Sequence, residues 1–200
     1  MLADIQSDTA KTHPITTRLQ SLDDAHLWLN VSKDNELAFS ILYKKYTQRL
    51  YNYGMHNCHD RDLVVDCLQE LFTSLWSKRK SLSVVQSVNA YLFKSFRCLL
   101  VKKITWRKRF LLSLDASHEK SFGITLPVED VMEIDENEKD RNARLTVCIK
   151  ALTKRQREAV FLKFYNDLTY SDIATIMELQ IDSVYNIISK ALESLRQQLK

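Results

Sequence analysis

The chain has 200 residues, 45% of them hydrophobic, which is enough for one or two small domains with cores of their own. It contains only two glycines and two prolines, fewer turn residues than sheets and hairpins need, so we predict an all-α protein. No run approaches the roughly 18 apolar residues of a membrane span, and residues 1–20 are too polar for a signal peptide, so we expect a cytoplasmic protein without direct membrane insertion.

The formal net charge of +4 hides a strong segregation of charge along the chain. Residues 71–114 contain ten lysines and arginines and no acid, whereas residues 115–140 contain nine acids and two lysines. Two basic modules joined by an acidic segment suit one long anionic ligand that is contacted twice. We therefore predict a mobile tail (1–20), a first helical domain (21–112), an acidic flexible linker (113–138) and a second helical domain (139–200).

Four helices are predicted in the first domain from the spacing of apolar residues and from capping residues. Their expected starts are just after Ser21, at Ser32 or Asp34, after Asp60 and near Ser87. The second of these helices is expected to end at Gly54, because glycine readily adopts the left-handed conformation of a C-cap.

The third predicted helix carries two different faces. Its apolar stripe consists of Val64, Cys67, Leu68, Leu71, Phe72 and Leu75. Asp66, Gln69 and Glu70 fall on another face, which is acidic and bears an amide. Such a face is either simply solvated or a docking surface for a basic partner protein, in which Gln69 would supply directional hydrogen bonds.

The fourth predicted helix is basic and aromatic. Residues 102–109 include five cations, which repel one another unless an anion lies opposite them. Cations neutralise phosphates, and aromatic faces stack on unpaired bases. Leu92, Phe96, Leu99 and Leu100 form one stripe that we interpret as core, but we interpret residues 102–109 as a nucleic-acid surface.

The last 60 residues contain two helix starts with a hydroxyl cap followed by an amide or acid three residues on. These are Thr153 with Gln156 and Thr169 with Asp172. A turn at residues 178–180 then separates two amphipathic segments, as in a helix-turn-helix that lays its second helix in the DNA major groove. A plain three-helix bundle would show similar spacing.

Metal and redox chemistry receive little support from the sequence. The cysteines, at positions 58, 67, 98 and 148, form no CxxC pair. His56, Cys58 and His59 lack a second ligand pair at zinc spacing, so we predict no metal site and no cofactor.

Three segments together resemble one protein family. Residues 66–72 (DCLQELF), which close on Leu75-Trp76, resemble the D-L-V-Q-E-V-F…L-W run of region 2.2 in sigma-70-type RNA polymerase sigma factors. Residues 89–97 (NAYLFKSFR) resemble the R-A-W-L-Y-R-I-A-R run of regions 2.3–2.4, and residues 152–174 resemble the start of region 4. The chain is most similar to the extracytoplasmic-function (ECF) group, which keeps only domains 2 and 4.

The resemblance implies partners and roles. Core RNA polymerase would bind Asp66, Gln69, Glu70, Phe72 and Trp76. The −10 element of promoter DNA would contact Lys80, Tyr91, Lys94, Arg97, Lys102, Lys103 and Arg107. The −35 element would contact Ser183, Tyr185, Asn186 and Lys190. Many relatives are also held by an anti-sigma factor, in some cases a membrane-anchored one, so such a partner is expected.

The chain departs from the family pattern at several positions. Cys98 stands where the family commonly has Asn, and Glu178 stands where the turn usually has Gly. Tyr185 and Ile187 replace cations of the recognition helix, so we expect the isolated second domain to bind the −35 element weakly.

Two other classes of protein fit the sequence less well. A helix-turn-helix regulator that binds operator DNA without polymerase normally dimerises, yet no sustained heptad occurs here. A nuclease or recombinase needs clustered acids or a nucleophile in its basic module, and residues 71–114 contain no acid. The sequence therefore predicts a sigma factor that is not an enzyme.

Overall fold

The computed structural model describes residues 23–114, 145 and 147–199. Every regular element within these ranges is helical, which confirms the all-α prediction. The predicted tail (1–20), nearly all of the predicted linker (113–138) and residues 139–144 lie outside the described residues. Positions 113 and 114 continue the helix before them instead of starting a linker.

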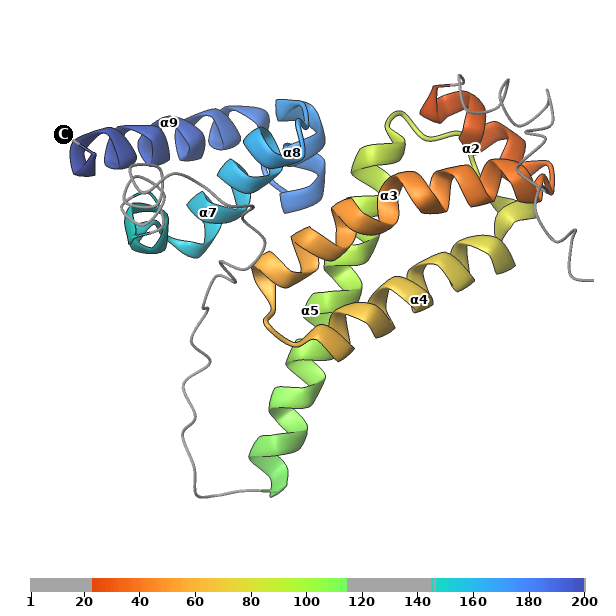
Figure 1. Cartoon of the computed structure of the whole chain (residues 1–200), viewed down its shortest axis with the longest axis horizontal. Coiled ribbons are helices and arrows are strands. Elements are labelled where there is room, and N and C mark those ends of the chain that lie inside the picture. The colour runs from red at the N-terminus through yellow and green to blue at the C-terminus, as the bar shows by residue number, and fades with distance from the viewer. Residues whose placement is uncertain (1–22, 115–144, 146, 200) are drawn as a thin grey trace, which may run out of the picture.

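The described helices fall into two groups (Figure 1). The first group consists of α2 (Asp24–Ser32), α3 (Glu36–Asn57), α4 (Arg61–Ser77), the short 3-10 helix η1 (Arg79–Ser81) and α5 (Val88–Leu114). The second consists of α7 (Lys154–Val160), the π-helical turn η2 (Phe161–Tyr165), α8 (Tyr170–Met177) and α9 (Ile181–Gln198).

Side-chain caps fix where the helices of the first group begin. The Asp60 carboxylate accepts from the backbone N–H of Leu63, as predicted. The second predicted helix is capped by Asn35, one residue after Asp34 and three after Ser32, because the Asn35 amide oxygen accepts from the N–H of Ala38. Asp34 instead has a left-handed backbone (φ 69°) and forms the bend before that helix.

Gly54 does not end its helix, so the predicted C-cap is wrong. Helix α3 continues to Asn57, and Gly54 is buried within it. A Cβ at this position would come within 2.7 Å of a Val64 side-chain carbon on α4 and within 3.1 Å of the Phe96 ring on α5. Glycine is therefore needed here for the close approach of three helices.

The core of the first group lies between α3, α4 and α5. Fully buried Tyr46, Leu50 and Tyr53 of α3 pack in one cluster with buried side chains of the neighbouring helices. Phe93 and Phe96 of α5 belong to the same cluster, and the Phe93 ring meets Tyr53 edge-on at a centroid distance of 5.5 Å. Burial of large aromatic side chains of this kind contributes strongly to stability.

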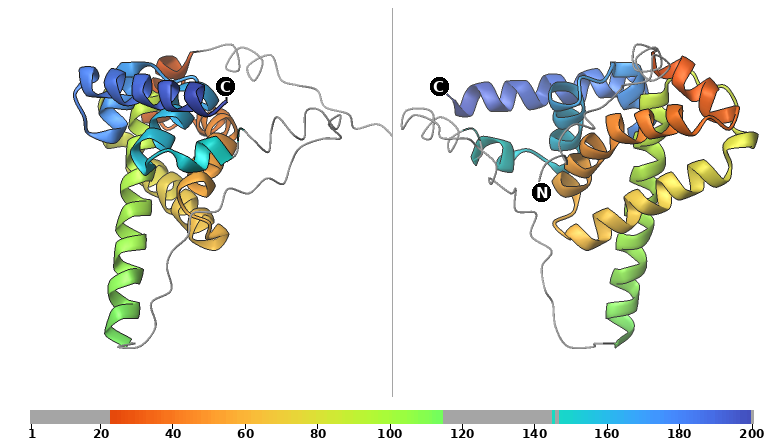
Figure 2. Two further views of the ribbon diagram at one scale, coloured as in Figure 1. Left: turned by 90° about the vertical axis from the view of Figure 1, so that its left-hand side faces the viewer. Right: turned by 45° about the vertical axis from the view of Figure 1, so that its right-hand side comes forward.

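The C-terminal half of α5 projects beyond the other helices of the first group, as both views of Figure 2 show. Exposure rises toward this segment: Val101 is 51% exposed, whereas Leu92 and Phe96 are fully buried. This projecting segment contains the basic stretch 102–109, which therefore lies beyond the other helices of the first group.

Both predicted capping boxes in the second group are confirmed. Thr153 and Gln156 exchange side-chain and backbone hydrogen bonds at the start of α7, and Thr169 and Asp172 do so at the start of α8. Glu178 takes the left-handed conformation (φ 56°) that ends α8, a conformation that glycine adopts most readily. Helices α8 and α9 pack against one another as a helix-turn-helix.

Candidate functional site

Three residues of α4 form an exposed polar patch, which we call the α4 polar face: Asp66, Gln69 and Glu70. They lie opposite the buried stripe of this helix, as predicted. The Glu70 carboxylate forms an ion pair with Lys103 of α5 at 2.9 Å. This hydrogen bond raises the pKa of Lys103. The patch is therefore acidic and amide-bearing and borders a cation of the neighbouring helix.

Phe72, predicted to contact the polymerase, is not on the surface. Its side chain is only 3% exposed and packs edge-on against Tyr43 at a ring-centroid distance of 4.7 Å. The prediction was wrong in treating Phe72 as a direct contact, because the residue that ends the sequence motif belongs to the apolar stripe. Phe72 supports the α4 polar face from behind.

Trp76 is half-buried and fixes the end of α4. Its ring lies 4.9 Å from that of Phe39, and the Arg79 guanidinium stands over the ring, 4.1 Å from its centroid. Such a cation–π contact orders both side chains. Trp76 thus serves as a packing anchor for the turn that leads to η1, while part of the ring remains accessible.

A groove runs between α4 and α5 and connects the α4 polar face with the basic surface. Its lining includes Glu70, Leu75, Lys78, Tyr91, Cys98 and Lys102. Cys98 is the one exposed cysteine of the four in the chain. The groove therefore combines apolar side chains with cations along its length and presents the thiol of Cys98.

The predicted −10 contacts occupy different environments. Tyr91 is 37% exposed and is braced edge-on by Trp28 at 4.8 Å, and Lys102 is exposed on the groove. Lys80 lies 3.3 Å from an Asp34 oxygen, and Arg107 pairs with Asp60. These exposed ion pairs are weak, so an arriving phosphate can compete for the cations.

The loop between η1 and α5 is held to the first helix of the group. The Trp28 indole N–H donates to the Ser83 carbonyl at 3.0 Å. Leu29, Leu82 and Val84 line a cavity beside this bond, and the Val84 side chain is 88% exposed. The loop is thus anchored at one point while it offers apolar side chains to solvent.

Lys94 and Arg97 face the second group of helices instead of open surface. Lys94 lies 3.3 Å from a Glu178 oxygen, and the Arg97 Nε donates to the Glu158 carboxylate at 2.8 Å. The resemblance implied that both cations contact the −10 element of promoter DNA. In the folded chain, both are engaged by acids of the second group.

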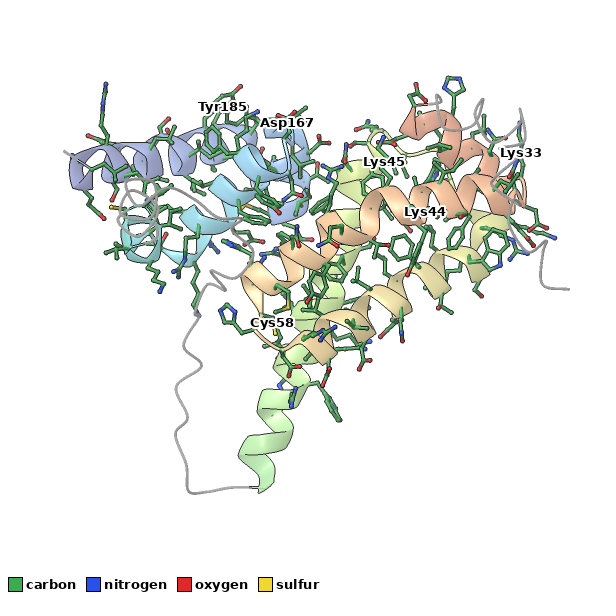
Figure 3. All side chains as sticks on the ribbon, viewed as in Figure 1. Lys33, Lys44, Lys45, Cys58, Asp167 and Tyr185 are labelled. Carbon is green, nitrogen blue, oxygen red and sulfur yellow. The ribbon has the colours of Figure 1, made fainter. Side chains whose placement is uncertain are left out.

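Tyr185 is an exposed aromatic side chain of α9, the helix predicted to contact the −35 element. Its ring stacks on that of Tyr170 at a centroid distance of 3.9 Å and an interplanar angle of 18°. It remains 48% exposed and points away from the first group of helices (Figure 3). Asn186 and Lys190 are exposed and Ser183 is half-buried, so the four predicted −35 residues are accessible on α9.

Sequence analysis missed a polar cluster between the two groups of helices. Glu158 is 8% exposed, and the Tyr53 hydroxyl donates to its carboxylate at 2.6 Å. Burial, reinforced by the charge of Glu158, raises the pKa of Tyr53 well above its usual value. Arg49 adds a hydrogen bond to the Asn166 carbonyl at 2.6 Å. One feature of the sequence could have indicated this cluster: the acid Glu158 of α7 is followed directly by apolar residues.

Residues 142–195 match the family model of Sigma-70, region 4. The ECF RNA polymerase sigma factor SigK of Mycobacterium tuberculosis H37Rv is 26% identical over 182 residues, which cover 90% of this chain and 94% of SigK. SigK of Mycobacterium bovis BCG aligns with the same identity and coverage. The chain is thus similar to ECF-type sigma factors over most of its length, and residues 142–195 match region 4 of the sigma-70 family.

Solved structures show a similar fold. CnrH, in complex with the cytosolic domain of CnrY, gives a TM-score of 0.57 at 17% identity and covers 88% of this chain and 96% of its own. The sigma factor RpoE of Bartonella quintana, in complex with the anti-sigma factor NepR, gives 0.56 at 20% identity and covers 76% and 90%. Within the described residues of the sigma factor, no helix has the length and hydropathy needed to span a bilayer.

Proposed function

We propose that this sigma factor binds core RNA polymerase through the α4 polar face and directs it to promoter DNA. The observation that carries the proposal is the exposure of Asp66, Gln69 and Glu70 on one helix, opposite a tightly packed stripe. An acidic, hydrogen-bonding patch on a rigid element suits a basic helical partner. The groove beside it leads to the cations of α5, so polymerase and DNA would be engaged by adjacent surfaces.

Promoter DNA would be contacted at two places. The −10 element would lie along the exposed face of α5, with Tyr91 available for stacking and Lys102, Lys103 and Arg107 for phosphates. The −35 element would be read by α9, in which Tyr185 and Asn186 are exposed toward solvent. Hydroxyl and amide groups suit base edges in the major groove.

An anti-sigma factor is the expected inhibitory partner. Two solved sigma factors of this fold were captured with such partners, the cytosolic domain of CnrY and NepR. We propose that the present sigma factor is also held by an anti-sigma factor, either soluble or membrane-anchored. Affinity capture with the purified chain from its own cells, followed by identification of the bound protein, tests this part.

Run-off transcription with purified core polymerase tests the main proposal. The wild-type chain should support initiation from a subset of genomic fragments, whereas Asp66→Lys combined with Glu70→Lys should not. Glu36→Lys combined with Glu193→Lys changes the charge equally at exposed positions outside the α4 polar face and serves as the control. Initiation by the Asp66 and Glu70 variant at the control level would contradict the proposal.

The rival function is an operator-binding regulator that acts without polymerase. Such a regulator would be dimeric and would bind a palindromic site tightly on its own. Light scattering and DNA binding by the free chain distinguish the two functions, since the sigma factor should be monomeric and should bind DNA specifically only with core.

A further inference from the structure

The two groups of helices meet along a surface formed by α3 and α5 on one side and by α7, η2 and α8 on the other (Figures 1 and 2). We propose that this surface is an intramolecular latch, which closes the free chain and withholds Arg97 and Lys94 from promoter DNA until the two groups separate. The inference rests on the proposed function, because it concerns when the sigma factor can engage DNA.

Glu158 is the centre of the latch. Its carboxylate is almost fully buried, yet the side chains that donate to it, the Tyr53 hydroxyl and the Arg97 Nε, come from the first group. A buried carboxylate needs hydrogen-bond donors or an opposite charge, because burial removes its hydration. Glu158 is therefore satisfied across the interface, by residues 105 and 61 positions away in the chain.

Further contacts surround this centre. The Arg49 Nη2 donates to the Asn166 carbonyl at 2.6 Å, and the Asn52 amide donates to the Tyr165 hydroxyl at 2.6 Å. His56 of α3 stacks on Phe161 of η2 with ring centroids 4.2 Å apart and an angle of 18° between the rings. Contacts on several elements fix the relative orientation of the two groups, which a single ion pair would not do.

The composition of the interface suits opening as well as closure. The Asn166 side chain is buried, and neither its amide nitrogen nor its oxygen has a hydrogen-bond partner. A buried polar group without a partner favours the state in which water can reach it. The interface thus carries an ion pair, a hydroxyl and an unsatisfied amide beside the buried apolar side chains that the two groups share in one cluster.

Closure affects the two DNA-binding surfaces differently. Arg97 is engaged by Glu158 and Lys94 by Glu178, so these two cations of the predicted −10 surface face acids of the same chain. Tyr185 of the recognition helix remains exposed on the far side of the second group (Figure 3). The latch therefore restricts the −10 surface while it leaves the −35 surface accessible.

Two substitutions test the latch in the full-length chain without core polymerase. Glu158→Gln removes the central charge, and Tyr53→Phe removes one donor from the other side of the interface and leaves the second group unchanged. Glu193→Gln makes the same charge change at an exposed residue of α9 and is the control for Glu158→Gln. Circular dichroism and thermal melting establish that each variant is folded.

Small-angle scattering and binding to a fluorescent promoter duplex are the two measurements. Opening should increase the radius of gyration, and it should tighten binding on the order of tenfold, because the fraction of competent molecules rises. The radius and the affinity of Glu158→Gln are compared with those of Glu193→Gln, and those of Tyr53→Phe are compared with wild type. An unchanged radius in both variants overturns the latch, and so does a larger radius without tighter binding. If Glu158→Gln fails to fold, Tyr53→Phe alone decides.

Run-off transcription with core, performed on the same preparations, separates this inference from the proposed function. Initiation by wild type combined with unchanged scattering rejects the latch and keeps the function. Opening of the variants combined with no initiation by wild type rejects the function and keeps the closed interface.

Discussion

The Lys103 ammonium group of α5 lies 2.9 Å from the Glu70 carboxylate of α4, and this ion pair joins the predicted polymerase surface to the predicted DNA surface. Lys103 is about one-third exposed and Glu70 about half exposed. The pair therefore contributes little to stability, as is usual for ion pairs that water can reach. Binding of a basic polymerase segment to Glu70 would release Lys103 toward DNA.

Glu70→Lys should abolish binding to core polymerase and leave the fold intact. It places a cation beside Lys103 and reverses the charge of the α4 polar face, but it removes no buried contact, so the melting temperature should change little. Co-purification with core measures the effect. Glu36→Lys, at the exposed start of α3, is the matched control and should bind core normally. Retained binding by Glu70→Lys would show that the partner docks elsewhere.

Removal of cations from α5 should weaken DNA binding by the holoenzyme and reduce its salt dependence. The triple variant Lys102→Ala, Lys103→Ala, Arg107→Ala should lower the slope of log K against log salt, by up to about 0.9 for each phosphate that is no longer neutralised. In the holoenzyme Lys102→Ala and Lys103→Ala should contribute alike, because polymerase bound at Glu70 releases Lys103 from its ion pair. The triple variant with an unchanged slope would show that these side chains do not face DNA.

The four cysteines should differ sharply in reactivity. Cys98 is exposed in the groove between α4 and α5, whereas Cys58, Cys67 and Cys148 are buried. Burial raises the pKa of Cys67 to about 11, which suppresses its reactive thiolate. Mass spectrometry after brief treatment with a maleimide should find Cys98 modified first. Promoter DNA bound to the holoenzyme should protect Cys98 from labelling. Equal labelling with and without DNA would show that the groove is not part of the −10 surface.

Local chemistry explains which parts of the fold the sequence predicts. The capping boxes at Thr153 and Thr169 and the cap at Asp60 depend on residues three positions apart, so the sequence predicts them correctly. The prediction for Gly54 was wrong because its function depends on Val64 and Phe96, which reach it only after three helices have packed.

The candidate site shows the same division between local and distant causes. The α4 polar face follows from helical periodicity, and its exposure was predicted. The engagement of Arg97 by Glu158 was not, because those residues lie 61 positions apart and neither flanking sequence indicates the other. Phe72 was misassigned because a sequence motif does not distinguish a contacting residue from one that supports it from behind.

Closure of the two helical groups should weaken on mild acidification. Burial, followed by the nearby charge of Arg157, lowers the pKa of His56 from 6.5 to about 4, whereas the Glu158 carboxylate acts in the opposite direction and His59 adds to the lowering. Opening exposes His56 to solvent and returns its pKa toward 6.5. Below that pH the open state therefore binds a proton that the closed state does not bind. Closure therefore has its full stability above that pH and loses it as the pH falls toward 4.

The radius of gyration of the free chain, measured between about pH 7.5 and pH 5, should rise with acid in the wild type. His56→Phe preserves the stacking on Phe161 and removes the titrating group, so its radius should rise less. Equal profiles for the two proteins would show that another group controls any opening.

Recognition of the −35 element should depend on Asn186 and on the stack of Tyr170 with Tyr185. Asn186→Ala should cost about 1–3 kcal/mol against the preferred −35 sequence and much less against scrambled DNA, because an amide reads a base edge. Tyr170→Ala should remove the ring that lies 3.9 Å from Tyr185 and so lower specificity without touching DNA, whereas Tyr170→Phe should retain both. Promoter selection with each holoenzyme measures these preferences. A wild-type −35 preference in Asn186→Ala would show that α9 does not read bases through this residue, and equal specificity of Tyr170→Ala and Tyr170→Phe would show that the stack does not position Tyr185.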